Sequence, residues 1–335
     1  MRSVVGTSFG PPESFVMTER PVPEPGEGQV RIRIGATALG YVDGLIIQGR
    51  YQLRPSLPYV PGGEIAGTVD AVGHGVVSLR VGDCVVTWQL GGGLADYIVV
   101  DATEVDAVEA RLSLPVAAAM LVDYQTAHYA LFEEGGLNAG DTILVLGASG
   151  SVASAAVQLA ARAGAHVIAA ASTEEKRAAA MRLGACAAVD YTRPDWRDAL
   201  KQLAPGGAVD VVLDPVGGDL FEPAFRSLAK GGRYLVVGFA AGHIPSLPVN
   251  LALVKNAVLM GVDVRHFLST QPGRARRVRR GLFSLVASGS LAKPGMTLFK
   301  LEEAREALAA TMLRERKGKV VVLVDPVMAS SASPT

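Results

Sequence analysis

Short apolar runs alternate with alanine-rich segments along the middle of this 335-residue chain, from about Tyr124 to Asp263. The apolar runs are TILVLG, HVIAAAS, VDVVLD and RYLVVGF, and the segments between them include SAAVQLAARAG and EEKRAAAMRLG. Such runs are typical of strands buried on both faces, and the segments between them have the periodicity of helices. The alternation therefore predicts an α/β fold with a parallel, doubly wound sheet.

The part of the chain before this stretch has a different texture. From Gln29 to about Asp123 it contains VRIRIGA, IAGTVDAV, VGDCVVTW and ADYIVV, cut by glycine and proline turns, which predicts a mostly antiparallel β domain. Beyond the middle stretch we expect a helix from Arg274 to Ser288, then another helix and a closing strand, VVVLV. Because that strand resembles the first half, we expect residues 1–123 and 265–335 to form one domain and residues 124–264 the other.

Charge and cysteine content exclude several classes of protein. Thirty-two basic residues balance 32 acidic ones, so no overall field attracts nucleic acid, and none is expected as a partner. The two cysteines, Cys84 and Cys186, are too few for a disulfide framework. No secretion signal is visible, and no apolar run approaches the ~20 residues that cross a bilayer. We expect a cytoplasmic protein that has no membrane partner.

The turn after the run ILVL resembles a dinucleotide-binding fingerprint in altered form. Its three glycine places are occupied by Ala148, Gly150 and Ala153. Those places serve a tight turn, close approach of the backbone to a pyrophosphate, and contact between helix and strand. Gly150 keeps the bare backbone where the phosphate comes closest, and the helix that follows would offer its N-terminal amides to the anion.

The end of the next apolar run indicates which nucleotide is bound. An NAD-binding chain has an acidic residue about 20 residues after the turn, but here the sequence is Ser172-Thr173-Glu174-Glu175-Lys176. Hydroxyls and a lysine at that place favour a 2′-phosphate and hence NADPH. The alternative is a helix cap, since Ser172 and Glu175 have the spacing of a capping box. Such a cap would still leave Lys176 able to reach a phosphate.

Several longer stretches carry a family resemblance. GASGSVASAAVQLA, VDVVLDPVGGDLFEPAFRSLAKGGRYLVVGFA, NLALVKN and IQGRYQLRPSLPYVPGGEIAGTVDAVG resemble the medium-chain dehydrogenase/reductase superfamily, and within it the zinc-independent NADPH:quinone oxidoreductase branch. The resemblance implies a GroES-like catalytic domain that is interrupted by a Rossmann domain, and a homodimer. It also implies that the cofactor contacts the following residues: Thr126, Gly150, Ser151, Val152, Ser172, Lys176, Tyr191, Gly238, Phe239 and Asn256.

The chain departs from this family's pattern in three places. Glycines are usual where Ser151 and Ala153 stand, so the pyrophosphate turn is more crowded. The family often has an asparagine where this chain has Gly40, so a polar side chain is missing from the expected active-site floor. Beyond Val262, the sequence Asp263-Val264-Arg265-His266 replaces the usual aromatic and glycine residues, so we expect a distinctive substrate mouth.

Zinc-dependent members of the superfamily hold their catalytic metal with cysteine and histidine at the positions of Gly40 and Gly63, so no metal is expected here. We interpret Glu64 as a structural carboxylate that bonds nearby backbone or an arginine. Without a metal, the substrates that suit hydride transfer are activated by conjugation, such as quinones, enones and enoyl thioesters. The resemblance makes Tyr51 the candidate acid or anchor, with packing on the cleft wall as its alternative role.

Two further residues, Tyr41 and Asp43, are candidate catalytic groups, although Asp43 is better suited to orienting backbone. The expected function is reduction of a quinone or an α,β-unsaturated carbonyl with NADPH. One alternative is an enoyl-thioester (acyl-CoA) reductase, which Tyr51 and the run GRARRVRRG would favour. If this run, Gly273 to Gly281, does not bind coenzyme A, we expect it to be a solvated helix. The other alternative, favoured by Gly40, is an NADPH-binding sensor or structural protein with little turnover.

Overall fold

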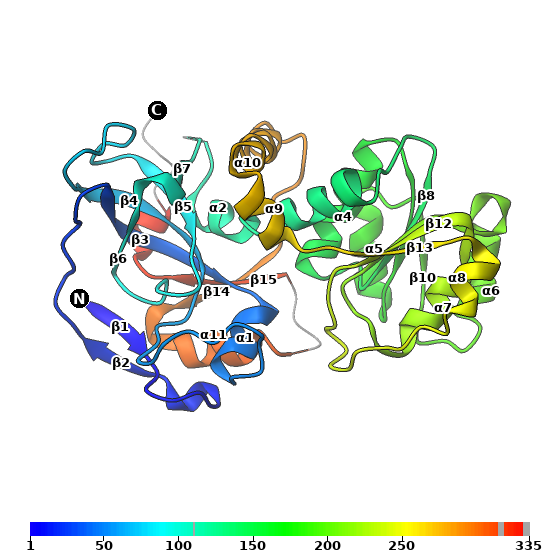
Figure 1. Ribbon diagram of the computed structural model, residues 1–335, viewed down its shortest axis with the longest axis horizontal. Helices are drawn as coiled ribbons and strands as arrows, with labels where there is room; N and C mark the ends of the chain where they lie inside the picture. The colour runs from blue at the N-terminus through cyan, green and yellow to red at the C-terminus, as the bar shows by residue number, and fades with distance from the viewer. Residues whose placement is uncertain (110, 314–317, 331–335) are drawn as a thin grey trace. The chain divides into compact units, whose positions relative to one another are not determined.

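The computed structural model describes residues 1–109, 111–313 and 318–330, and the chain divides into two compact units (Figure 1). Unit 1 contains Met1–Val122 and Arg279–Thr335, and unit 2 contains Asp123–Val278. Within the described residues, no helix combines the length and the apolar character that crossing a membrane requires.

Unit 2 is built on a six-stranded parallel sheet with the strand order β10-β9-β8-β11-β12-β13, which confirms the doubly wound fold. Its strands are β8 (Thr142–Leu146), β9 (His166–Ala170), β10 (Ala187–Val189), β11 (Val209–Asp214), β12 (Leu228–Val236) and β13 (Val258–Gly261). Every residue of β8 is buried, as its unbroken apolar run predicts. The chain reverses direction across the sheet between β8 and β11, and ligands of such sheets bind at the carboxyl edge beside that point.

The helices of unit 2 precede, connect or follow these strands. They are α3 (Asp123–His128), α4 (Ser151–Arg162), α5 (Glu174–Arg182), α6 (Trp196–Leu203), α7 (Phe221–Arg226), α8 (Asn250–Lys255) and α9 (Val264–Thr270), with a π-helix over Tyr129–Glu134. The face of α4 that carries Ala153, Ala156 and Val157 is fully buried, because small side chains let the helix lie close to the sheet. On the other side of the sheet Phe221, Phe225 and Tyr234 pack together around Leu228.

Unit 1 contains a seven-stranded sheet, in which six strands follow the order β14-β15-β3-β4-β5-β7 and the seventh, β6, pairs with β3. Its strands are β3 (Gln29–Leu39), β4 (Glu64–Val72), β5 (Cys84–Trp88), β6 (Tyr97–Asp101), β7 (Val105–Ala107), β14 (Met296–Lys300) and β15 (Lys319–Leu323). All pairs are antiparallel except β14 with β15. The C-terminal strands therefore share a sheet with the N-terminal ones, and β15 pairs directly with β3.

The remaining elements of unit 1 cover this sheet or extend it. A separate hairpin joins β1 (Arg2–Val5) to β2 (Val16–Glu19), and the helices are α1 (Tyr41–Ile47), α2 (Leu114–Met120), α11 (Ala304–Ala310) and α12 (Pro326–Ser330). One core cluster joins Ile34 and Ile65 of the sheet to Ile47 of α1 and Leu308 of α11. The expected helix at residues 274–288 is α10 (Pro272–Ala287), which runs across the boundary between the two units.

Candidate functional site

The glycine-rich turn joins the carboxyl end of β8 to the first residue of α4. Gly147 has a positive φ of +58°, and a Cβ placed on it would lie 2.7 Å from Val216 of the neighbouring strand's turn. Gly150 is the N-cap residue of α4, and its N–H donates to the Gly147 carbonyl over 2.8 Å. The first turn of α4 holds no acidic side chain, so its amide groups keep their preference for an anion.

The two alanines of the altered fingerprint are accommodated in the interior. Ala148 and Ala153 are both fully buried, which means that their methyl groups fill packed space rather than the approach to the turn. A Cβ on Gly150 would meet only the Gly147 carbonyl, at 3.3 Å, so the outer side of Gly150 is open. The expected crowding therefore comes from Ser151 alone, whose side chain is half-buried at the start of α4.

At the end of β9, the helix cap that is the alternative to a phosphate site lies one residue further along the chain than Ser172. Thr173, not Ser172, is the N-cap of α5, and its hydroxyl accepts from Lys176 N–H over 3.3 Å. The hydroxyl of Ser172 stays outside that cap. Lys176 lies half-buried in the first turn of α5. Its neighbour Arg177 pairs with Asp190, at 2.9 Å, and donates to the Ala171 carbonyl. Tyr191 follows β10 and is also half-buried.

Asp214, a buried carboxylate that the sequence did not single out, fixes the backbone that follows β11 at the carboxyl edge of the sheet. Asp214 ends β11, and its Oδ1 accepts from the N–H groups of Val216, at 2.7 Å, and Gly217, at 2.8 Å. Tyr234 donates to Oδ2 over 2.6 Å, and burial raises the pKa of both side chains. The Asp214 carbonyl accepts from Gly238 N–H, so the same residue also positions the segment that carries Phe239.

The sheet brings together most, but not all, of the expected cofactor residues. Because all its strands are parallel, the turns that hold Gly150–Val152, Ser172, Tyr191 and Gly238 lie at one edge. Thr126 is buried on α3, which packs against α4. Asn256 lies just before β13 and thus at the opposite, amino edge, so the structure does not place it with the others. There it ends α8 with a left-handed backbone, φ +49°.

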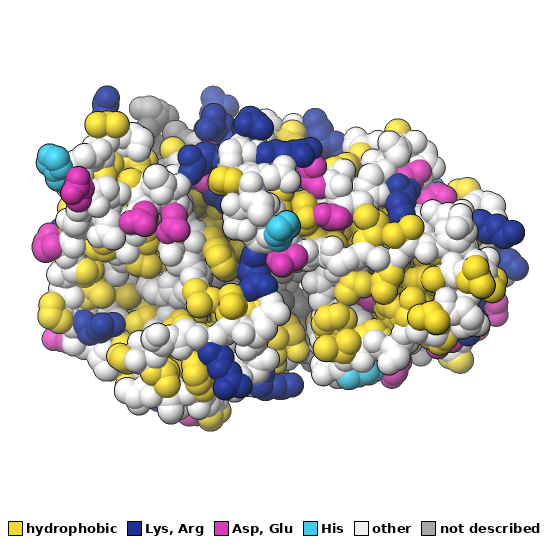
Figure 2. Space-filling view, viewed as in Figure 1, with side chains coloured by type: hydrophobic (Ala, Val, Ile, Leu, Met, Phe, Trp, Pro, Cys, Tyr) yellow, Lys and Arg dark blue, Asp and Glu magenta, His cyan; other side chains and the backbone are white. Residues whose placement is uncertain are grey.

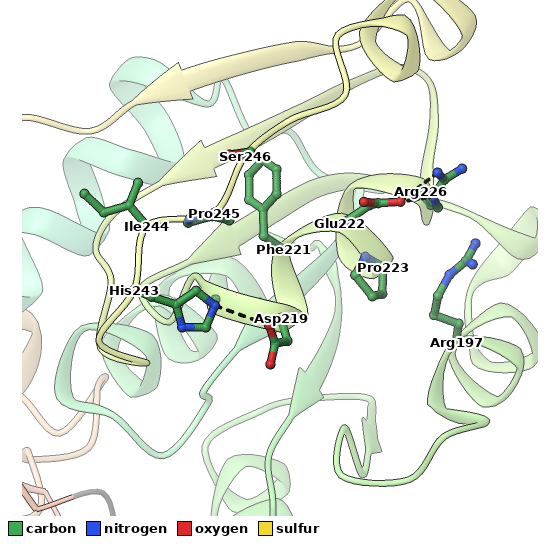
Figure 3. Close-up of a pocket in the computed structure, with 11 residues that line it drawn as sticks. Arg197, Asp219, Phe221, Glu222, Pro223, Arg226, His243, Ile244, Pro245 and Ser246 are labelled. Carbon is green, nitrogen blue, oxygen red and sulfur yellow. Dashed lines mark hydrogen bonds and ion pairs between the residues drawn. The ribbon is translucent and has the colours of Figure 1, made fainter.

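Unit 2 also contains a pocket that no sequence pattern pointed to (Figure 3). Its volume is about 570 Å³, and it lies among α6, α7 and the loop after β12. Figure 3 shows His243 directed at Asp219, 3.2 Å away, and the guanidinium groups of Arg197 and Arg226 at the other end. Arg226 is paired with Glu222, at 2.7 Å. Phe221 and Pro223 add apolar surface to this mixed wall.

In unit 1, two of the candidate catalytic residues, Tyr41 and Asp43, lie in the first turn of α1. Tyr41 is half-buried in the first turn, and Asp43 is buried with its Oδ2 accepting from Gly40 N–H over 2.7 Å. Burial raises the pKa of Asp43, while that N–H and the charge of Lys319 oppose the rise. Asp43 thus caps the helix, which is the backbone-orienting geometry of a structural carboxylate.

Glu64 forms a buried ion pair that bridges the two ends of the chain. Its Oε1 lies 2.5 Å from Lys319 Nζ, and its Oε2 accepts from Val122 N–H over 3.1 Å. The side chains of Lys319 and Glu64 are only 1% and 6% exposed. The backbone partner agrees with the structural interpretation of Glu64, but the basic partner is a lysine, not the arginine that was considered.

The positions at which zinc-dependent relatives hold their metal do not fit a metal ion. A Cβ on Gly63 would lie 2.3 Å from the Gln89 carbonyl, so no histidine can stand there without moving the backbone. At Gly40 the nearest atom to such a Cβ is the Lys319 ammonium nitrogen, at 3.5 Å. Elsewhere in the described chain, no group of three or more His, Cys, Asp or Glu side chains could hold a metal ion.

Two tyrosines near this place differ in their surroundings. Tyr51 is half-buried and packs against the core cluster of unit 1. Tyr59, which the sequence did not single out, is buried and donates to the Leu90 carbonyl over 2.8 Å. Burial raises the pKa of Tyr59, so its phenol stays protonated and structural.

The arginine run lies on α10, and Figure 2 shows basic side chains gathered over that helix. Arg274 pairs with Glu133 at 2.5 Å, and Arg279 pairs with Asp106. Arg277 and Arg280 are exposed. Part of the run is therefore used in ion pairs, and part faces solvent as a surface helix would.

Models of two families match the chain. That of the zinc-binding dehydrogenase family covers residues 151–278, and that of the alcohol dehydrogenase GroES-like domain covers residues 26–110. Over 315 residues the chain is 37% identical to quinone oxidoreductase-like protein 2 of Bos taurus, a match that spans 91% of this chain and 87% of the relative.

Solved structures resemble the whole fold. A crystal structure of an NAD-dependent alcohol dehydrogenase matches with a TM-score of 0.88 and 31% identity, over 97% of this chain and 100% of that one. The Escherichia coli quinone oxidoreductase complexed with NADPH matches with the same TM-score of 0.88 and 25% identity, again over 97% and 100% of the two chains. The two neighbours thus differ in their nucleotide, which is NAD in the first and NADPH in the second.

Proposed function

This chain belongs to the medium-chain dehydrogenase/reductase superfamily and is quinone oxidoreductase-like, and from that premise we propose that it reduces a quinone or an α,β-unsaturated carbonyl with NADPH, without a metal. The observation that carries the proposal is the carboxyl edge of unit 2. There the open backbone of Gly150 caps a helix that has no acid in its first turn, and Lys176 lies half-buried in the first turn of α5, which follows β9.

The residues at this edge fit a phosphorylated dinucleotide. The amide groups at the start of α4 bind the pyrophosphate, since unpaired helix N-terminal donors attract anions. Ser172 and Lys176 hold the 2′-phosphate, because a lysine pairs with phosphate whereas the acid typical of NAD sites would repel it. The turn that Asp214 fixes holds Gly238 and Phe239 beside the rest of the cofactor. The bound nicotinamide supplies a hydride.

The chemistry beyond hydride delivery falls to side chains of unit 1. Reduction of a conjugated carbonyl leaves negative charge on its oxygen, which needs a hydrogen-bond donor or a proton. Tyr51 supplies the donor, because a phenol is protonated at neutral pH. Tyr41 lies at the start of α1, ten residues before Tyr51, and Asp43 holds the start of that helix in place through Gly40.

Fluorescence titration with NADPH and with NADH tests the cofactor directly. We expect NADPH to bind more tightly, and Lys176→Ala to weaken NADPH by about tenfold or more while leaving NADH unchanged, because only NADPH has the phosphate. Lys201→Ala is the matched control, since Lys201 is an exposed lysine on α6. Equal affinity for both nucleotides in the wild type would contradict the NADPH assignment.

Two alternatives make different predictions. An enoyl-thioester reductase would show a rate that depends on the coenzyme A tail and on the exposed Arg277 and Arg280 of α10, whose charges suit its phosphates. A binding protein with little turnover would take up NADPH but reduce neither quinones, enones nor enoyl-CoA. The missing side chain at Gly40 favours this second alternative, and an acceptor screen distinguishes all three.

As partners, we propose a small-molecule acceptor and a second copy of this chain, with neither nucleic acid nor a membrane. The dimer is supported by an apolar surface at the edge of the parallel sheet. On the edge strand β13, Val258 and Leu259 are 50% and 45% exposed, and on the adjacent helix α8, Leu253 is 83% exposed. An edge of this kind pairs readily with another strand.

A further inference from the structure

An ion pair links the ends of two neighbouring strands at the carboxyl edge of unit 2. Asp190 directly follows β10, and its Oδ2 lies 2.9 Å from Nη1 of Arg177, in the first turn of α5. The same Nη1 donates to the carbonyl of Ala171, just after β9, over 3.1 Å. The side chains of Arg177 and Asp190 are 22% and 23% exposed. The pair therefore joins three segments: the loop after β9, the start of α5 and the loop after β10.

Asp190 also shapes the loop that follows it. Its Oδ1 accepts from the Thr192 hydroxyl over 2.7 Å and from the Thr192 N–H over 3.0 Å, and its carbonyl accepts from Arg193 N–H over 3.3 Å. The Thr192 hydroxyl, its N–H and the charge of Arg177 hold the pKa of Asp190 below its usual range, against the effect of burial. Asp190 is therefore ionised at neutral pH, and the turn that it closes contains Tyr191.

This network contains the direct sequence neighbours of all three residues that are expected at the 2′-phosphate. Ala171 precedes Ser172, Arg177 follows Lys176, and Asp190 precedes Tyr191. The three expected residues belong to separate segments, and long side chains lose conformational freedom when they close on a ligand. Because the network fixes those segments before a ligand arrives, it lowers that cost.

Neither stability nor simple charge explains an acid at this place. An ion pair as exposed as that of Asp190 with Arg177 contributes little to stability. A negative charge beside a phosphate site is unfavourable in itself, and an NAD site uses such a charge at the end of the preceding strand. The contacts of Asp190 with both neighbouring segments remain as its distinguishing feature.

We propose that Asp190 is a positioning residue, which together with Arg177 fixes the 2′-phosphate site and so favours NADPH over NADH. This inference rests on the proposed function. Asp190 acts on the phosphate through other residues: Arg177 ties it to the turn of α5 that carries Lys176, and Thr192 closes the turn around Tyr191. Arg177 holds Asp190 and the Ala171 carbonyl and is not itself the phosphate ligand.

Calorimetric titration of the whole protein with adenosine 2′,5′-bisphosphate and with adenosine 5′-monophosphate tests the proposal. The two probes differ only in the 2′-phosphate, so the ratio of their affinities measures what the protein gains from that group. In Asp190→Asn we expect this ratio to fall about three- to tenfold, through weaker binding of the bisphosphate alone. Simple charge predicts the opposite sign, because the variant loses a negative charge. A ratio that stays the same or rises overturns the proposal.

A second variant shows whether the two residues act together. We expect Arg177→Gln to weaken the bisphosphate about as much as Asp190→Asn does, and the double variant to be little weaker than either single one. If Arg177 binds the phosphate itself, Asp190→Asn would release it and strengthen binding, whereas Arg177→Gln would weaken binding. That pair of opposite effects would show that the assignment to Asp190 is wrong.

Asp195→Asn is the matched control, because it removes the same charge from the same loop. Asp195 pairs with Arg193 at 3.1 Å and is exposed, so we expect this variant to keep the affinity ratio of the wild type. An equal fall in the control would mean that any acid of this loop has the effect, and would overturn the proposal. Thermal unfolding of each variant accompanies the titrations. Equal weakening of both probes in Asp190→Asn would assign Asp190 to the fold and not to the phosphate site.

This proposal and the proposed function fail in different ways. If the wild type prefers the bisphosphate and Asp190→Asn removes that preference, but no quinone, enone or enoyl-CoA is reduced, the activity is wrong and the role of Asp190 stands. If acceptors are reduced with NADPH and Asp190→Asn keeps the preference of the wild type, only the role of Asp190 is wrong. A wild type without any preference contradicts the NADPH assignment, and the role of Asp190 falls with it.

Discussion

The hydroxyl of Tyr234 donates to Asp214 Oδ2 over 2.6 Å across neighbouring strands of the parallel sheet, and both residues are buried. Asp214 uses its other oxygen to hold the backbone of Val216 and Gly217. The pair therefore couples the interior of unit 2 to the turn at its carboxyl edge.

We expect Tyr234→Phe to lower the free energy of unfolding by about 1–3 kcal/mol, because a buried acceptor loses its donor. NADPH affinity should fall as well, since the turn beside the cofactor loses its fixed anchor. Urea denaturation and fluorescence titration measure the two effects. Tyr97→Phe is the control, because Tyr97 is a half-buried tyrosine of unit 1. A variant that loses stability yet binds NADPH normally would show that the anchor does not reach the cofactor.

Gly150 offers a test that separates fold from binding. Its φ of −69° suits any residue, and a Cβ would meet only the Gly147 carbonyl at 3.3 Å. Because serine is a good N-cap, Gly150→Ser should keep or raise the stability of the protein. Its hydroxyl would, however, occupy the amides that the pyrophosphate needs, so we expect NADPH affinity to fall at least tenfold.

The comparison variant for Gly150 is Ala153→Gly, at the third place of the fingerprint. Because Ala153 is fully buried within α4, its loss should cost about 1 kcal/mol of stability and leave NADPH affinity nearly unchanged. Thermal unfolding and fluorescence titration of both variants check these expectations. Normal NADPH binding by Gly150→Ser would mean that the phosphate does not approach this backbone.

The parts of the fold that depend on local pattern were predictable. The apolar runs specify buried parallel strands, and the turn that contains Gly150 follows such a run. The cap at Thr173 was missed because serine and threonine are both favoured N-cap residues, and only the backbone at the end of β9 decides between Ser172 and Thr173. Asn256 was carried over by resemblance, and only the strand order shows that it lies at the amino edge.

The ion pair of Glu64 with Lys319 lay beyond sequence reasoning for a different reason. The two residues are 255 positions apart, and the run GKVVVL reads as an ordinary closing strand. What joins them is the pairing of β15 and β4 on either side of β3, a long-range feature with no local signal. A buried lysine at a strand start would look like any exposed one in the sequence.

The apolar edge of unit 2 predicts the oligomeric state. If β13 pairs with a second copy, Leu259→Lys should place a charge in the interface and convert the dimer to a monomer. Val77→Lys is the control, because Val77 is 94% exposed and lies in unit 1. Light scattering coupled to size exclusion measures the mass of each. A dimer that persists in the Leu259 variant would assign the interface to another surface.

His128 predicts how stability changes with pH. It lies at the end of α3 with its ring 5.0 Å from that of Phe132, and within the described residues its buried Nδ1 has no hydrogen-bond partner. Burial lowers the pKa of His128 below the usual 6.5, with Glu133 opposing the shift and Arg274 adding to it. The unfolded chain therefore binds the proton more readily than the folded one, and folding stability falls as the pH drops below about 6.5.

We expect His128→Gln to lose less stability than the wild type between pH 7.5 and about pH 5.5, as followed by urea denaturation at each pH. His74→Gln, at an exposed histidine of unit 1, should behave like the wild type. If the wild type and His128→Gln have parallel pH profiles, the acid sensitivity belongs to other groups and His128 is not held neutral by its burial.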